Sequence, residues 1–266
     1  MTGGSRLALA QYELRRAGPA ALLTPPGVLL TGVVMVVLTA SSGGAYHPVA
    51  GTVLEALLPL AAGIATSGVL TTDSAVELQL SLPVPYRQTL ARRVLLTLGG
   101  AAGLSGAAAV LAAAAGLWTS PHGPWAGQLT WLAPAVALSG VGVLLAALSV
   151  NAAFAGGAVA GIWVGEQSYK PWFATHSWAH PLFLFPDTRR GVVPAGDWVA
   201  NRLTLLAVGL AALAVAWVVL TDTERLLSGD GRLAVLSRRV ARPRDDRPRR
   251  AAVIAAGSRP SQKGRL

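Results

Sequence analysis

The chain has 266 residues, of which 53% are hydrophobic and 13% are charged. Soluble domains carry about 25% charged residues, so this composition indicates the lipid bilayer as solvent and excludes an ordinary soluble domain. There is no cysteine, which excludes disulfides and thiolate metal sites. The net charge is +10, but twelve of the 22 Lys and Arg follow Leu220. This distribution fits a tail beside anionic lipid better than a nucleic-acid interface.

Apolar stretches predict an all-α integral membrane protein with six transmembrane helices. A span needs about 20 predominantly apolar residues, because an unpaired backbone amide in lipid costs several kcal/mol. The fifth stretch is short, since only fourteen residues run from Ala152 to Gly165 before Glu166. It predicts either a re-entrant segment or a helix that continues into residues 166–169. The six predicted spans are 21–40, 49–71, 94–117, 129–150, a stretch from Ala152, and 203–220.

The distribution of Lys and Arg predicts the orientation of these spans. Basic residues occur before the first span, between the second and third, and in the tail, which all lie on one side if there are six spans. Loops 41–48 and 118–128 contain none. Residues 166–202 contain four, offset by three acids. We therefore expect a multi-pass protein of the cell membrane with both termini cytoplasmic.

Three segments lie outside the predicted spans. In residues 1–20, apolar side chains share one helical face and charged ones the other, which predicts an amphipathic helix in the cytoplasmic interface. A plain positive-inside anchor is the alternative, and a cleaved signal peptide is disfavoured because Glu13 precedes the apolar stretch and no A-x-A site follows. The tail, residues 221–266, is rich in Arg and Pro and is predicted to be partly disordered.

The extracellular stretch 166–202 is rich in Trp and Phe, which favour the membrane interface. We expect short interfacial or re-entrant helices there, before the last span. His176 and His180 are spaced as i and i+4 and could share a metal ion, but no third ligand is evident. We therefore expect interfacial packing of these histidines and no metal.

Glu55 is the one ionisable residue inside a predicted span. It lies six residues from the outer end of the second span, which is about 9 Å at 1.5 Å per residue. Acids inside spans are costly and usually face a cavity or a partner. One interpretation places Glu55 and Pro59, which can kink the helix, on the substrate path. The other has Glu55 reaching the outer interface or hydrogen-bonding a neighbour.

Glycines recur at a spacing of four in two predicted spans. Gly99 and Gly103 form one pair, and Gly157, Gly161 and Gly165 form a longer ladder. Small residues one turn apart let helices approach closely. We expect these glycines to pack helices within the chain, and a dimer seam is the alternative.

Sequence motifs of common enzymes are absent. The chain has no G-x-x-x-x-G-K-[ST], so it has no phosphate-binding loop for ATP, and it has neither H-E-x-x-H nor G-x-S-x-G. No set of paired polar groups for an intramembrane enzyme is visible. We therefore predict that this chain is not itself an enzyme.

Between the second and third predicted spans, residues 73–96 read DSAVELQLSLPVPYRQTLARRVLL. The segment keeps apolar residues among its charges, which favours a docking surface over a plain solvated loop. It resembles the ABC type-2 permease family, in which an acid, leucines, a proline and basic residues occur in this order before the third span. Val84-Pro85-Tyr86 departs from the family pattern, and the stretch 197–227 also resembles actinobacterial members. The residues that carry the resemblance are Glu77, Leu80, Leu82, Pro83, Arg87 and Arg92.

The resemblance implies the membrane-spanning permease subunit of an ATP-binding cassette exporter. Residues 73–93 then correspond to the cytoplasmic coupling segment that docks on separate ABC ATPase subunits, which hold the ATP and Mg²⁺. A second permease, identical or paralogous, would complete the transporter. The mostly apolar composition suits a lipid, hydrophobic drug or peptide as substrate. The alternative function is a non-transporting membrane subunit that anchors or assembles another protein through its basic tail.

The predicted orientation can be tested with single cysteines, because the chain has none. Ser42→Cys lies in the predicted outer loop, and Ser228→Cys lies in the predicted cytoplasmic tail. A membrane-impermeant maleimide should label the first variant on intact cells, and the second only after permeabilisation. Labelling of the tail cysteine on intact cells contradicts the orientation.

Overall fold

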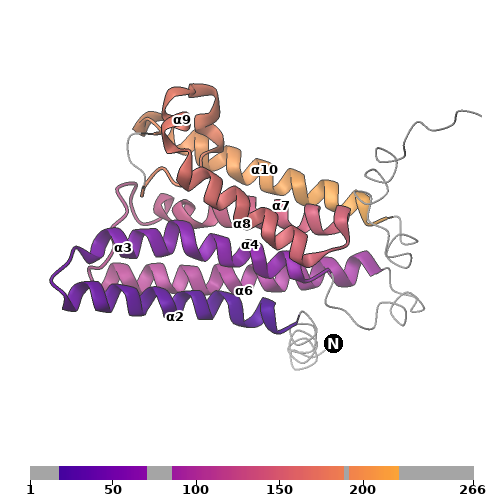
Figure 1. The fold of residues 1–266 in the computed structure, drawn as a ribbon, viewed down its shortest axis with the longest axis horizontal. Helices are drawn as coiled ribbons and strands as arrows, with labels where there is room; N and C mark the ends of the chain where they lie inside the picture. Colours follow the sequence, from indigo (N-terminus) through magenta and orange to yellow (C-terminus); the bar gives the residue numbers. More distant parts are fainter. Residues whose placement is uncertain (1–17, 71–85, 189–191, 222–266) are drawn as a thin grey trace, which may run out of the picture.

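The computed structural model describes residues 18–70, 86–188 and 192–221. The predicted amphipathic helix lies almost entirely outside these ranges, and so do nearly all of the tail and most of segment 73–93. The described part is helical and contains no strand (Figure 1).

Twelve helical elements occur in the described residues. Helix α3, the π-helical turn η1 and α4 follow one another without a break. The elements that build the bundle are α2 (Pro19–Ser41), α3 (Tyr46–Thr52), η1 (Val53–Leu57), α4 (Leu58–Gly68), α6 (Tyr86–Ala114), α7 (Leu129–Ser149), α8 (Ala152–Ser168) and α10 (Trp198–Val219). The short ones are η2 (Ala126–Gln128), α9 (Lys170–Thr175), η3 (Ser177–Leu182) and η4 (Ala195–Asp197).

Five helical segments among the described residues are long and apolar enough to cross a membrane. They are Ala21–Ser41, Tyr46–Gly68, Gln88–Ala114, Ala126–Ser149 and Ala195–Val219. Helix α8 has 17 residues and spans about 25 Å, less than the roughly 30 Å of a bilayer core. It continues past Glu166 to Ser168, but a sixth crossing stays a prediction.

Helices α6 and α10 begin earlier than the hydropathy pattern predicted. Helix α6 begins at Tyr86 rather than Val94, so Arg87, Arg92 and Arg93 belong to its first turns. Helix α10 begins at Trp198, before the predicted start at residue 203. The hydropathy pattern underestimates the length of such helices, because the charged residues at their ends lie outside the apolar stretch. The tight break predicted near Asn151 is confirmed, since the Asn151 side chain caps α8 by accepting a hydrogen bond from the Phe154 N–H.

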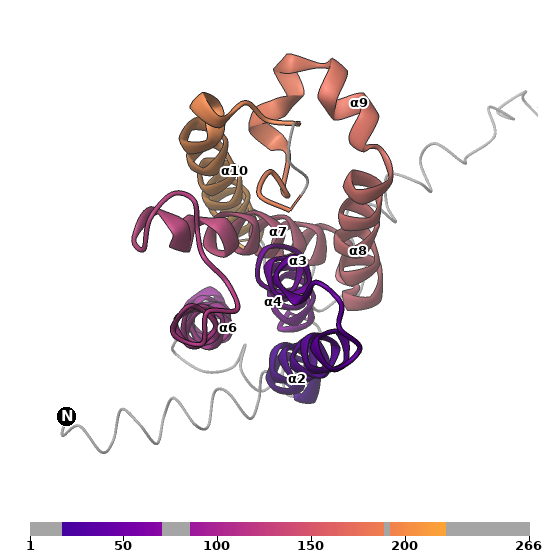
Figure 2. The same ribbon diagram turned by 90° about the vertical axis from the view of Figure 1, so that its left-hand side faces the viewer.

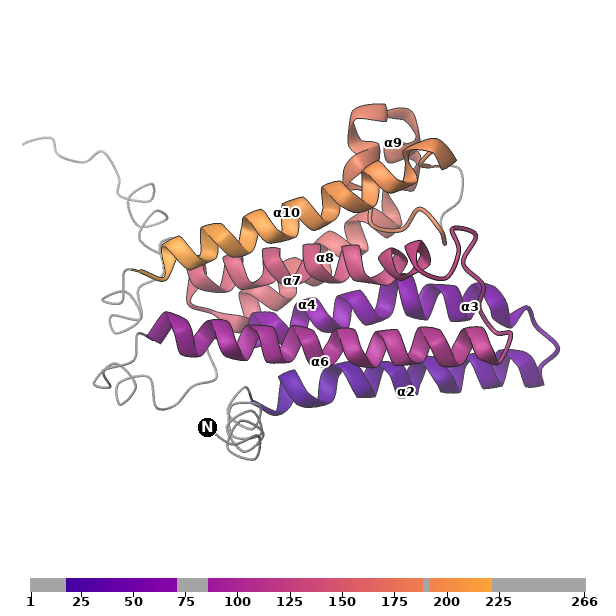
Figure 3. The same ribbon diagram turned by 180° about the vertical axis from the view of Figure 1, so that it is seen from behind.

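Successive long helices alternate in direction along the bundle (Figures 1 and 3). One end carries α9, η3 and η4 together with the α6–α7 connection, and we call it the capped end (Figure 1). The described stretches end at residues 18, 70, 86 and 221 at the opposite end, which we call the open end. The segment that resembles a coupling element therefore leaves and re-enters the bundle beside both described chain ends.

Helices α4 and α7 form the centre of the bundle (Figure 2). Helix α4 contacts α2, α6, α7 and α8, while α7 also packs against α10 on its other side. The peripheral helix α2 leaves large aliphatic side chains such as Leu30, Val33 and Leu38 exposed. Apolar side chains on an outer surface are suited to contact with lipid rather than water.

Close packing depends on glycines other than the predicted ones. A Cβ built on Gly140 would overlap the backbone of Gly209, and one on Gly209 would overlap the Val136 carbonyl. Gly63 and Gly142 similarly let α4 and α7 approach each other. In contrast, a Cβ would meet no described atom within 4 Å at the predicted positions, Gly99, Gly103, Gly157, Gly161 and Gly165. Helix packing within the described chain therefore does not use these ladders.

Substitution of the α7–α10 glycines should destabilise the bundle. Gly140→Ala and Gly209→Ala each force two backbones apart, at an expected cost of about 1–3 kcal/mol in the free energy of unfolding. Gly103→Ala is the matched control, because its methyl group enters open space. Thermal unfolding of the purified chain, followed by circular dichroism, measures the difference. Equal midpoints for Gly140→Ala and Gly103→Ala contradict the close approach.

Candidate functional site

A π-helical turn positions Glu55 near the capped end. In residues 53–57 the backbone hydrogen bond spans five residues instead of the four of an α-helix: the Leu58 N–H donates to the Val53 carbonyl. Pro59 follows and has no N–H to donate to the Glu55 carbonyl, so the regular α-helical pattern cannot continue across this turn. The indole of Trp163 on α8 donates to the Ala56 carbonyl at 3.0 Å. Such turns occur mostly as single-turn bulges within α-helices, and they are frequent at functional sites.

The Glu55 carboxylate is fully buried and accepts three hydrogen bonds. Its Oε1 accepts from Arg202 Nη2 at 2.6 Å and from the Asp187 N–H at 2.9 Å. Its Oε2 accepts from the Thr188 N–H at 2.5 Å. Neither Glu55 nor Arg202 has any side-chain exposure. Of the predicted alternatives, the structure shows that Glu55 hydrogen-bonds its neighbours.

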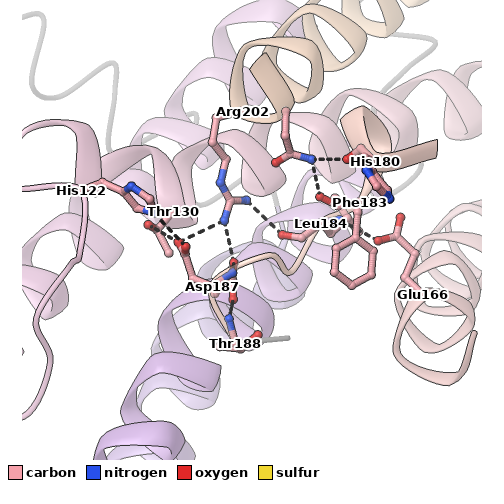
Figure 4. Close-up of polar contacts among 11 residues, drawn as sticks. His122, Thr130, Glu166, His180, Phe183, Leu184, Asp187, Thr188 and Arg202 are labelled. Atoms are coloured by element: carbon pink, nitrogen blue, oxygen red, sulfur yellow. Dashed lines mark hydrogen bonds and ion pairs between the residues drawn. The ribbon is translucent and has the colours of Figure 1, made fainter. Parts of the chain in front are cut away.

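Arg202 lies at the second turn of α10, which points its side chain across the bundle (Figure 4). Besides Glu55, its Nη1 donates to the Leu184 carbonyl at 3.0 Å, and its Nη2 reaches Asp187 Oδ2 at 3.3 Å. The guanidinium also lies 5.5 Å from the centroid of the Trp198 ring. A buried charge of this kind is tolerated only when it is paired and hydrogen-bonded. Arg202 is therefore not a free positive charge of the loop to which the sequence assigned it.

Asp187 joins three further parts of the capped end (Figure 4). Its Oδ2 accepts from the Thr130 hydroxyl of α7 at 2.8 Å. Its Oδ1 lies 3.2 Å from Nε2 of His122, in the α6–α7 connection. The His122 ring stacks on Trp198 with 3.7 Å between centroids. One carboxylate thus links the connection, α7 and α10.

The remaining contacts fix the segment that carries Asp187. Asn201 Nδ2 donates to the carbonyls of His180 and Phe183, at 2.7 and 2.8 Å. The Leu184 N–H donates to the Glu166 carboxylate of α8 at 2.7 Å (Figure 4). Residues 180–188 are therefore attached to both α8 and α10, and this attachment holds Asp187 over η1.

The two predicted histidines do not gather a metal-binding group. His176 stacks on Trp172 with 4.6 Å between ring centroids, and its Nδ1 lies 2.8 Å from the Trp172 carbonyl oxygen. Within residues 18–70, 86–188 and 192–221, no group of three or more His, Cys, Asp or Glu could hold a metal ion. Trp172 also packs edge-to-face with Trp178, so this region is an aromatic cluster.

A cavity of about 1120 Å³ lies beside the Glu55–Arg202–Asp187 network. Its wall is formed by α3 and η1, the α6–α7 connection, the first turn of α7, the end of α8, and residues near 187 and 195. Glu55 lines this cavity, but Pro59 does not. Of the two residues predicted on a substrate path, only Glu55 borders the cavity.

The other predicted site residues lie toward the open end. Glu77, Leu80, Leu82 and Pro83 fall outside the described residues, and Arg87 lies in the first turn of α6. Arg92 is exposed on α6, whereas its neighbour Arg93 is buried. The structure thus leaves the predicted docking surface without a test.

Sequence reasoning missed the partners of Glu55. Asp187 and Arg202 are 132 and 147 residues further along the chain. One signal did exist, because an acid within an apolar span requires a partner and Arg202 directly precedes the predicted sixth span. No signal pointed to His122 or Thr130, since a single His or Thr in a connection is ordinary.

Comparison of the chain with family models, curated proteins and solved structures found no match. The fold therefore provides the classification. Five long apolar helices indicate a multi-pass α-helical membrane protein. Its capped end contains a buried ion-pair network beside a cavity.

Loss of the Glu55 charge should destabilise the capped end. Glu55→Gln leaves the buried Arg202 guanidinium without its main partner, at an expected cost of about 3–5 kcal/mol. Adding Arg202→Gln should recover part of this loss, because the charge that then remains, Asp187, is partly exposed and no fully buried charge is unpaired. The free energy of unfolding of the purified chain measures both effects.

Glu166→Gln is the matched control for this experiment. Its amide oxygen can still accept the Leu184 N–H, so the expected cost is below about 1 kcal/mol. A double variant no more stable than Glu55→Gln alone contradicts a coupled ion pair.

Proposed function

We propose that this chain is the membrane-spanning permease subunit of an ATP-binding cassette exporter. The observation that carries the proposal is the pattern from Glu77 to Arg92, a charged segment with apolar residues and prolines between two apolar helices. The chain lacks an ATP-binding motif, so separate ATPase subunits would dock on this segment and supply ATP hydrolysis.

The geometry of the bundle supports a lever between two ends. Segment 71–85 joins the end of α4 to the start of α6 at the open end. From there, α4, η1 and α3 form one continuous helical path of 23 residues to the capped end. Such a path has a length of about 34 Å, and it carries Glu55 to the wall of the cavity. Motion imposed on α4 by an ATPase would therefore reach the ion-pair network directly.

The network borders the cavity on the side of η1 and α10. Alternating access requires two arrangements of the helices with different contacts in each. Here the Arg202 guanidinium joins η1, α10 and the segment of Asp187 in one arrangement. A second permease, identical or paralogous, would complete the translocation path in the bilayer, with a hydrophobic lipid, drug or peptide as the exported molecule.

Reversal of the Glu77 charge should uncouple the transporter. The chain is co-expressed with an ABC ATPase encoded beside it, and the two are purified together and reconstituted. Glu77→Arg is expected to lower transport-coupled ATP hydrolysis at least about tenfold, the effect of losing about 1.4 kcal/mol at the contact. Asp73→Arg, in the same segment but outside the pattern, should retain most of it.

Two outcomes contradict the proposal. One is that no ATPase copurifies with the chain, and the other is that Glu77→Arg transports like the wild type. Deletion of residues 238–266 tests the anchoring alternative. Complete loss of function with the helices intact would favour anchoring through the basic tail.

A further inference from the structure

We propose that the cavity at the capped end binds organic cations, with Asp187 as the counter-charge. The inference adds a class of substrate to the proposed function. It starts from an imbalance of charge in the cavity wall. Among the described residues that line the cavity there are two carboxylates, Glu55 and Asp187, and neither Lys nor Arg. Arg202 approaches from behind the wall.

The two carboxylates share a single guanidinium unequally. Arg202 Nη2 lies 2.6 Å from Glu55 but 3.3 Å from Asp187. Glu55 has two backbone N–H donors in addition, whereas the other partners of Asp187 are the neutral Thr130 hydroxyl and His122. One guanidinium against two carboxylates leaves one negative charge in this network. In a partly desolvated cavity this charge favours a cation.

Asp187 is also the accessible member of the network. Its side chain is 17% exposed, while those of Glu55 and Arg202 are fully buried. A bound cation can therefore reach the Asp187 carboxylate without displacing the Glu55–Arg202 pair. The exposed part faces the cavity, since Asp187 lines it.

The rest of the wall suits the apolar body of such a ligand. Trp118 and His122 line the cavity, together with several prolines and Val193. Trp198 is already covered, because His122 stacks on its ring and Arg202 lies near the ring centroid. Aromatic faces attract organic cations, and a volume of about 1120 Å³ accommodates a drug-sized molecule.

Equilibrium binding to the full chain, without any ATPase, tests this inference. The chain is reconstituted in lipid nanodiscs, and binding of radiolabelled tetraphenylphosphonium is measured above that of empty nanodiscs. Tetraphenylborate has nearly the same shape and the opposite charge. We expect saturable binding of the cation and only lipid partition of the anion. Saturable binding of both with similar affinity overturns the inference.

Asp187→Asn should weaken cation binding about tenfold or more, because it removes the unbalanced charge while preserving the shape. Asp197→Asn is the matched control, since Asp197 is an exposed acid of the same region that does not line the cavity. Removing the two positive charges that follow Thr188 in the sequence, with Arg189→Gln and Arg190→Gln, should not weaken binding. Equal effects of Asp187→Asn and Asp197→Asn overturn the inference.

Two further variants separate binding from folding. Asp187→Glu keeps the charge and should retain cation binding where Asp187→Asn loses it. Gly51→Trp changes no charge, and a Cβ at Gly51 meets only Thr188 Cγ2, at 3.7 Å. Because Gly51 lines the cavity, the indole should occupy the part of it beside Thr188 and weaken saturable binding. Binding by Gly51→Trp with wild-type affinity excludes the cavity as the site.

The two proposals fail independently. If cation binding depends on Asp187 but no ATPase associates with the chain, the cation site stands and the protein belongs to another class. If the chain shows ATPase-coupled transport but no saturable cation binding, the permease assignment stands and its substrate is of another class.

Discussion

The capped end depends on one buried pair of opposite charges. Glu55 and Arg202 have no side-chain exposure, so neither could be retained there alone. Their pairing at 2.6 Å brings η1 against α10, and the spare acceptor capacity of Glu55 then orders the backbone at Asp187 and Thr188. Asp187 in turn engages Thr130 and His122. The part of the cavity wall around Asp187 is therefore a consequence of this pair.

Packing along the bundle supplies the second constraint. Gly140 and Gly209 let α7 and α10 touch through their backbones, which sets the position of Arg202 relative to the centre. The π-helical turn before Pro59 sets the position of Glu55, which lies on the other side of α7 from α10. Neither helix could be moved away without separating the charges. Closure of the capped end and packing of the bundle are thus coupled, as the proposed lever from the open end requires.

Local patterns account for what could be predicted. Apolar stretches of sufficient length identified the five long spans, and an acid within one of them identified Glu55 as a residue in need of a partner. The glycine ladders were a weaker guide, because spacing shows where a close approach is possible but not which face meets a neighbour. Gly99 and Gly103 carry the motif without a contact, whereas Gly140 and Gly209 make the contact at isolated positions.

By itself, the sequence determined the membrane class, an all-helical fold and the absence of an ATP-binding motif, since these depend on composition and short-range pattern. Only the tertiary structure decided that Arg202 pairs with Glu55, that Asp187 is the accessible acid of the cavity, and that His122 lies beside Asp187. The physical reason is separation along the chain. Contacts between residues as far apart as 147 positions arise from the direction and packing of whole helices, which no local pattern records.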